Sequence, residues 1–144
     1  MAKPKTATLK WDGQALNFTG TGGSGFSLRF GGTSGPNAAS PMELVALASG
    51  ACTAMDVIDI LRKKRQEVAG FEVNVVGARA STHPKKFTEI DLEYVVRGHN
   101  VDPKAVERAI ELSLTKYCSV NATLQDSVKI NSHYRVEETE VVIA

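Results

Sequence analysis

Cysteine is scarce in this chain, which has only two, Cys52 and Cys118, among its 144 residues. Two cysteines cannot build the disulfide framework of a small secreted domain. The first five residues also lack the apolar stretch of a signal peptide, and this predicts a cytoplasmic protein. In that compartment a disulfide between the two cysteines would be transient, with a catalytic or redox-sensing role.

An excess of charge of one sign is missing as well. The formal net charge of +1 excludes a general nucleic-acid binder, because such proteins carry a large basic excess. The histidines, His83, His99 and His133, are far apart in the sequence, and the chain contains no Cys-x-x-Cys pair. Since metal sites usually show regular ligand spacing, we predict no metal, no cofactor and no nucleic-acid partner.

The sequence also lacks an uninterrupted membrane-spanning run. Residues 44–61 have the necessary length, but they include Asp56 and Asp59 and many small side chains. This composition favours a buried helix and no membrane partner. With 42% hydrophobic and 23% charged residues, the chain has a globular composition, and its length predicts a single domain over residues 1–144.

The first 35 residues predict three short strands, at residues 6–11, 15–19 and 26–30. Asp12-Gly13 is a hairpin-turn signal between the first two strands, and residues 21–25 are a glycine-rich turn before the third. Residues 31–37 are almost all turn formers, so they predict a loop.

A long helix is predicted over residues 40–65. Ser40 as N-cap, Pro41 at the first helical position and Glu43 two residues later form a capping box. The basic residues 62–65 suit the C-terminal end of the helix, and Gly70 marks the break. Helical spacing of apolar side chains predicts the buried face as Leu44, Leu47, Ala48, Ala51, Cys52, Met55 and Ile58.

The second half of the chain predicts two strands, a helix and a last strand. Residues 70–98 alternate in the manner of strands, most clearly at Ile90, Leu92, Tyr94 and Val96. Asp102-Pro103 then opens a helix over residues 102–118, with Cys118 at its end. A strand over residues 127–136 and a loose tail over residues 137–144 follow. This order indicates the α+β fold class.

Four residues suggest the chemistry of a reactive thiol: Cys52, Cys118, Arg29 and Glu43. A nearby arginine favours a thiolate, and a carboxylate can hold the guanidinium through paired hydrogen bonds. A thiolate that attacks a peroxide becomes a sulfenic acid, which a second thiol converts to a disulfide. Structural interpretations stay open, because free cysteines often pack as small hydrophobes, glutamate suits a capping box and a strand arginine can be solvated.

Three segments of the sequence carry motifs that occur together in one protein family. They are Gly25-Phe26-Ser27-Leu28-Arg29-Phe30, then Pro41-x-Glu43-Leu44 followed by Cys52, and Tyr117-Cys118-Ser119-Val120 followed by Leu124. In these motifs the chain resembles the OsmC/Ohr family of hydroperoxide reductases, and the resemblance covers nearly its whole length.

The resemblance implies a cofactor-free peroxidase that reduces organic hydroperoxides or hydrogen peroxide in oxidative stress defence. Cys52 would be the peroxidatic thiol and Cys118 the resolving thiol. Arg29 would stabilise the thiolate and polarise the peroxide, and Glu43 would orient the arginine. The family also implies an intertwined homodimer, with antiparallel sheets around two central helices, and regeneration by a dithiol such as a lipoyl-type reductant.

Two features depart from the family pattern. Many members have proline directly after the second cysteine, whereas this chain has Ser119. Asp56 lies four residues after Cys52, one helical turn away on the same face, where its charge would oppose thiolate formation. These departures favour an alternative function, a non-enzymatic OsmC-like dimer that binds a small molecule or senses redox state with structural cysteines.

Overall fold

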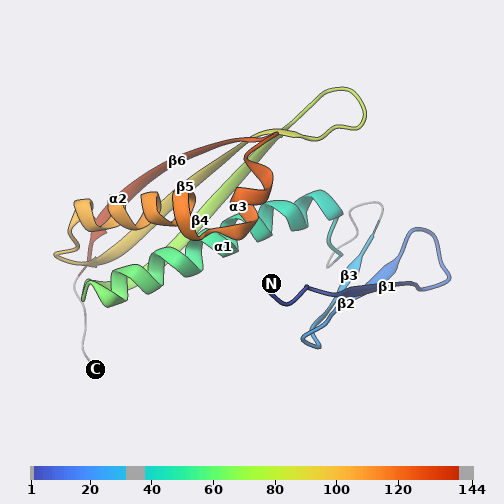
Figure 1. Cartoon of the computed structure of the whole chain (residues 1–144), viewed down its shortest axis with the longest axis horizontal. Helices are drawn as coiled ribbons and strands as arrows, with labels where there is room; N and C mark the ends of the chain where they lie inside the picture. The colour runs from blue at the N-terminus through green and yellow to red at the C-terminus, as the bar shows by residue number, and fades with distance from the viewer. Residues whose placement is uncertain (1, 32–37, 140–144) are drawn as a thin grey trace. The chain divides into compact units, whose positions relative to one another are not determined.

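The structure, a computed structural model, describes residues 2–31 and 38–139 (Figure 1). It divides into two compact units, residues 1–45 and residues 46–144. Residues 32–37 of the predicted loop and residues 140–144 of the predicted tail lie outside the described residues. The single domain over residues 1–144 stays a prediction.

The first unit contains an antiparallel sheet of three short strands. Strands β1 (Ala7–Trp11), β2 (Phe18–Gly22) and β3 (Ser27–Phe30) pair in the order β1-β2-β3. The prediction of a strand at residues 15–19 was wrong by three positions. Ala15 has a positive φ of 46°, and the Asp12 amide donates to the Asn17 carbonyl at 2.9 Å, so residues 12–17 form the turn.

Helix α1 (Pro41–Lys63) begins as the sequence predicts. The Ser40 amide donates to Glu43 Oε1 at 3.0 Å, and the Glu43 amide donates to Ser40 Oγ at 3.2 Å, which confirms the capping box. The break after the helix is at Arg65, not at Gly70. Arg65 adopts a positive φ of 57°, which ends the helix and leads the chain directly into β4 (Glu67–Arg79).

The second unit is built on a mixed sheet in the order β4-β5-β6. Strand β5 (Phe87–His99) pairs antiparallel with β4 and parallel with β6 (Lys129–Glu138). Together with the helices, this sheet confirms the α+β class. The predicted tail begins two residues too early, because Arg97 binds Glu137 at 2.9 Å and the Asn100 amide donates to Glu138, which keeps β6 on the sheet.

The predicted helix over residues 102–118 is interrupted. Helix α2 (Pro103–Leu112) has the predicted N-cap, where Asp102 accepts from the Lys104 amide at 3.0 Å. A π-helical turn, η1 (Ser113–Tyr117), follows it, and a short helix, α3 (Ser119–Leu124), comes next. In η1 the Cys118 amide donates to the carbonyl of Ser113, five residues earlier, so the regular helix cannot continue.

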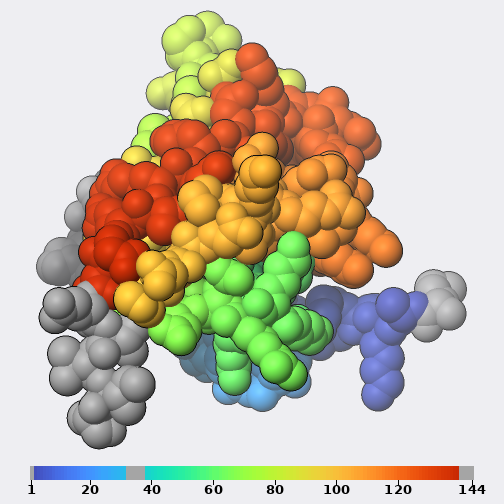
Figure 2. Space-filling view, turned by 90° about the vertical axis from the view of Figure 1, so that its left-hand side faces the viewer, coloured from blue at the N-terminus to red at the C-terminus, as the bar shows by residue number. Residues whose placement is uncertain are grey.

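Segments α2, η1 and α3 lie on one side of the sheet of the second unit (Figure 1). Figure 2 shows α2 between β6 and the C-terminal end of α1. The core between these layers contains the alternating side chains of β5, all fully buried as their spacing predicts: Ile90, Leu92, Tyr94 and Val96.

The buried face of α1 differs from the predicted one. Leu47 and Met55, which the spacing placed in the core, are 64% and 71% exposed. The buried residues are Ser49, Gly50, Thr53, Val57 and Leu61. A Cβ on Gly50 would lie 2.7 Å from Val75 Cγ2, so the missing side chain lets the helix approach strand β4.

In length and composition α1 is apolar enough to cross a membrane. Its buried residues include Ser49 and Thr53, and both hydroxyls are hydrogen-bonded to side chains of distant segments. These bonds are typical of a helix packed within a folded unit.

Candidate active site

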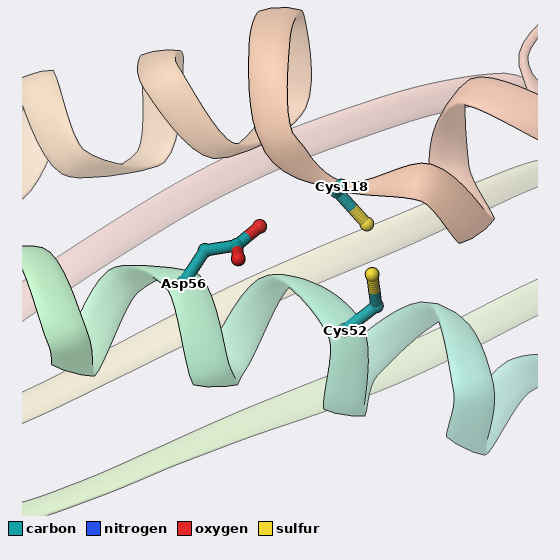
Figure 3. Close-up of side chains that lie close together, drawn as sticks. All are labelled: Cys52, Asp56 and Cys118. Carbon is teal, nitrogen blue, oxygen red and sulfur yellow. The ribbon is translucent and has the colours of Figure 1, made fainter. Parts of the chain in front are cut away.

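The two cysteines of the chain face each other in the second unit. Cys52 points from α1 and Cys118 points from the segment between η1 and α3, so that their sulfur atoms approach (Figure 3). Both thiols are free. Each Sγ atom and a carboxylate oxygen of Asp56 lie within 4.8 Å of one another. The structure therefore brings together two thiols that are distant in the sequence.

The π-helical turn sets the position of Cys118. Its amide donates to the Ser113 carbonyl at 2.7 Å, after which Cys118 is extended, with φ −77° and ψ 100°. It is then the N-cap of α3, and its Sγ accepts from the Asn121 amide at 3.4 Å. Cys118 thus lies between two helical segments rather than at the end of one, and its backbone is held on both sides.

A buried pair of side chains holds the start of α3 against α1. Ser49 Oγ donates to Asn121 Oδ1 at 2.6 Å, and Asn121 Nδ2 donates to the Ser49 carbonyl at 3.3 Å. Both residues are at most 1% exposed. The backbone amide of Asn121 also donates to Cys118 Sγ. The pair of Ser49 and Asn121 therefore fixes the second thiol opposite the helix that carries Cys52.

A chain of hydroxyl groups leads from the core to Asp56. Tyr94 Oη lies 2.8 Å from Thr53 Oγ1, which lies 2.8 Å from Ser113 Oγ, and Ser113 donates to Asp56 Oδ2 at 2.9 Å. Each hydroxyl has one hydrogen to donate, and the carboxylate at the end can only accept. The carboxylate therefore determines the direction of donation along the whole series of hydroxyl groups. Tyr94 donates to Thr53, Thr53 donates to Ser113, and Ser113 donates to Asp56.

Burial of the phenol agrees with this direction. It raises the pKa of Tyr94 to about 12, because the charged form would lose its hydration. Tyr94 therefore keeps its proton at neutral pH and is the first donor in this series of hydrogen-bonded hydroxyl groups. The carboxylate of Asp56 is thereby held by a hydrogen bond from Ser113.

The two sulfur atoms do not have equivalent surroundings. Burial, and after it the hydrogen bond with Cys52, raise the pKa of Cys118 to about 11, although the backbone amide of Asn121 opposes both effects. Cys118 is 3% exposed, whereas Cys52 is partly exposed. Cys118 is thus a protonated thiol at neutral pH, and Cys52 is the more accessible of the two.

Replacing Thr53 by valine tests the hydroxyl chain. Valine has nearly the same shape as threonine, but the buried hydroxyls of Tyr94 and Ser113 would each lose one hydrogen-bond partner. The free energy of unfolding should therefore fall by about 2 kcal/mol. Urea unfolding of the two proteins measures the difference. The control is Thr53→Ser, which keeps the hydroxyl and should cost about half as much. Equal losses in both variants would assign the effect to packing.

The other predicted site residues lie in the first unit. Arg29 is an exposed residue of β3, and Glu43 is an exposed residue in the first turn of α1. The hydrogen bonds from Ser40 lower the pKa of Glu43, so its capping role is established. The roles of Arg29 and Glu43 toward the thiols stay predictions.

Sequence reasoning missed most of the residues that hold the thiols. Asp56 was noted only as a charge near Cys52. Its partner Ser113 and the pair Ser49 and Asn121 were not considered. Ser49 and Thr53 lie four residues apart in an otherwise apolar helix, and this spacing of buried polar groups is the signal that could have found them.

The chain is similar in sequence to known proteins over most of its length. The model of the family described as OsmC-like protein matches residues 32–133. Protein YhfA of Escherichia coli (strain K12) is 42% identical over 130 residues, which are 90% of this chain and 96% of that protein.

Solved structures share the fold. A protein from Aquifex aeolicus VF5 is 34% identical, with a TM-score of 0.85 over 96% of this chain and 100% of that chain. An organic hydroperoxide resistance protein from Elizabethkingia anophelis is 13% identical, with a TM-score of 0.69 over 96% and 99% of the two chains. Since the family match spans more than two thirds of the sequence, the chain belongs to the OsmC-like protein family.

Proposed function

We propose that the protein is a thiol-dependent peroxidase that reduces organic hydroperoxides. The observation that carries the proposal is the approach of two free thiols from α1 and from the start of α3. Membership of the OsmC-like family, whose fold organic hydroperoxide resistance proteins share, supports the same function.

The reaction has three steps. The Cys52 thiolate attacks the terminal oxygen of the hydroperoxide, the O–O bond breaks, and the alkoxide takes a proton to leave as an alcohol. The Cys118 thiol then attacks the Cys52 sulfenic acid, so that a disulfide forms and water leaves. A dithiol, for example of the lipoyl type, reduces the disulfide and is itself oxidised.

Two further residues have roles in this proposal. Arg29 stabilises the thiolate and polarises the peroxide, and Glu43 orients the guanidinium. The capping bond of Glu43 uses Oε1, so Oε2 can accept from an arginine. We place the protein in the cytoplasm, where a dithiol pool can keep both cysteines reduced.

The exposed side of α1 supports a homodimer. Leu47 and Met55 lie on it with more than half of their surface accessible, next to the small exposed residues Ala48 and Ala51. An apolar helix face of this kind is usually covered by a partner. We propose that a second copy of the chain covers it.

Exposure of the reduced protein to one equivalent of cumene hydroperoxide tests the chemistry without a reductant. We expect one equivalent of alcohol, loss of both free thiols and a protein mass lower by two hydrogen atoms. The Cys118→Ser variant should stop at the sulfenic acid and gain the mass of one oxygen. Retention of both thiols in the wild-type protein would contradict the proposal.

The burial of Cys118 favours one alternative, a non-enzymatic dimer that binds a small molecule or senses redox state. A thiol that is 3% exposed, with its pKa raised, can be a structural residue. Unreactive thiols in the peroxide experiment would support this alternative.

A further inference from the structure

Three donor atoms of the second unit converge on one point. Cys52 and Asp56 lie one turn apart on the same face of α1, and Cys118 faces them from the start of α3 (Figure 3). Their two Sγ atoms and a carboxylate oxygen lie within 4.8 Å of one another. Because the donors come from two separate segments, the cluster has no Cys-x-x-Cys spacing by which the sequence could indicate it.

The separation of the donors suits a tetrahedral metal ion. With Zn–S bonds of about 2.3 Å and Zn–O bonds of about 2.1 Å, tetrahedral donors lie roughly 3.5–3.8 Å apart. The three atoms lie within 4.8 Å of one another, so a contraction of about 1.3 Å at most, which side-chain rotations can supply, would bring them to that spacing. Three protein donors leave the fourth position of the ion to water.

Supporting hydrogen bonds already orient two of the three donors. Ser113 donates to Asp56 Oδ2, and this hydrogen bond orients the carboxylate. The Asn121 amide donates to Cys118 Sγ, as is typical of thiolate ligands. Hydrogen bonds of this type orient the ligands before the metal binds, and they are typical of metal sites.

The type of donor selects the metal. Two thiolates are poor ligands for Mg²⁺ and Ca²⁺, which prefer oxygen, and a carboxylate is a poor ligand for Cu(I). A set of two sulfur atoms and one oxygen suits Zn²⁺. A pocket of about 280 Å³, lined by Asp56, Asp59, Lys63 and Tyr117, reaches the carboxylate member of the cluster.

We infer that the reduced protein binds one zinc ion through Cys52, Cys118 and Asp56, and that Cys118 releases its thiol proton to water when the ion binds. Zinc and peroxide then compete for the same thiols, because a thiolate held by the metal cannot attack the O–O bond. Binding of the ion does not depend on the proposed peroxidase activity, whereas its inhibitory effect does.

Metal titration of the reduced full-length chain tests this inference. We expect one Zn²⁺ per chain, and with Co²⁺ as the probe we expect thiolate-to-cobalt charge-transfer absorption together with the visible bands of a tetrahedral ion. Asp56→Asn keeps an acceptor for Ser113 and should weaken zinc binding at least tenfold. Cys118→Ser should abolish most of the charge-transfer absorption.

Asp59→Asn is the matched control, since Asp59 lines the same pocket on the same helix but is paired with Lys63 outside the cluster. It should bind zinc as the wild-type protein does. Absence of the charge-transfer absorption in the wild-type protein would overturn the inference, and so would equal zinc affinity in Asp56→Asn. Because no peroxide is used, failure of the peroxidase assay with zinc binding intact would overturn only the proposed function.

Discussion

Replacement of Cys52 by serine should lower hydroperoxide turnover at least about 1,000-fold, since loss of a catalytic nucleophile removes the covalent pathway. A serine hydroxyl stays protonated at neutral pH and cannot store the peroxide oxygen as a sulfenic acid. The side chains are nearly equal in size, so the fold should persist. Consumption of cumene hydroperoxide in the presence of a lipoyl-type dithiol measures the effect.

The comparison with Cys118→Ser makes this result specific. In that variant the first step remains, and the external dithiol must reduce the sulfenic acid directly, so turnover should be slower but measurable. Circular dichroism of both variants checks that each is folded. Turnover in Cys52→Ser close to the wild-type value would place the chemistry on another group of the chain.

Replacement of Gly98 by alanine should lower the free energy of unfolding by about 3 kcal/mol. Gly98 is buried in β5, and a Cβ there would lie 2.1 Å from the Glu67 carbonyl oxygen and 2.7 Å from Val101 Cγ2. The first contact is with backbone, which cannot rotate away. Strand β4 would have to move off the sheet at its first residues, and urea unfolding would record the loss.

Gly70→Ala is the matched control, because Gly70 lies in the neighbouring strand β4. A Cβ at Gly70 would meet only Arg97, at an ordinary contact distance of 3.7 Å. Its effect should stay within about 1 kcal/mol. Similar losses for both variants would show that the close approach of Glu67 to Gly98 does not limit stability.

Local patterns predicted those elements whose residues interact with near neighbours in the sequence. The capping box of Ser40 and Glu43 and the N-cap of Asp102 act over three residues or fewer, and both are present as predicted. Strand β5 was recognised because its alternation follows directly from burial of one face. These signals require no knowledge of distant segments.

The buried face of α1 could not be predicted in this way. Ser49 and Thr53 are buried because Asn121 and Tyr94 satisfy their hydroxyls, from positions 72 and 41 residues away. A hydrophobicity pattern assigns such residues to the surface and assigns Leu47 and Met55 to the core, which is the reverse of the structure. The interruption of the second helix at η1 is also without a local signal, since no proline or glycine lies within residues 113–117.

For the candidate site, the sequence predicted the two thiols through their motifs and placed Asp56 beside Cys52 through helical spacing. It could not predict that Ser113 holds Asp56 or that Asn121 holds Cys118. Those contacts depend on the π-helical turn, which moves Cys118 out of a regular helix.

The parallel pairing of β5 with β6 also affects the order in which the protein can be assembled during synthesis. Strands β4 and β5 are consecutive and antiparallel, so they can pair as soon as both have left the ribosome. Strand β6 joins β5 only after residues 100–128 have been made, and Cys118 lies within that stretch. A nascent chain that has not reached Cys118 therefore carries Cys52 without its partner, and the thiol pair forms only after β4 and β5 have been made.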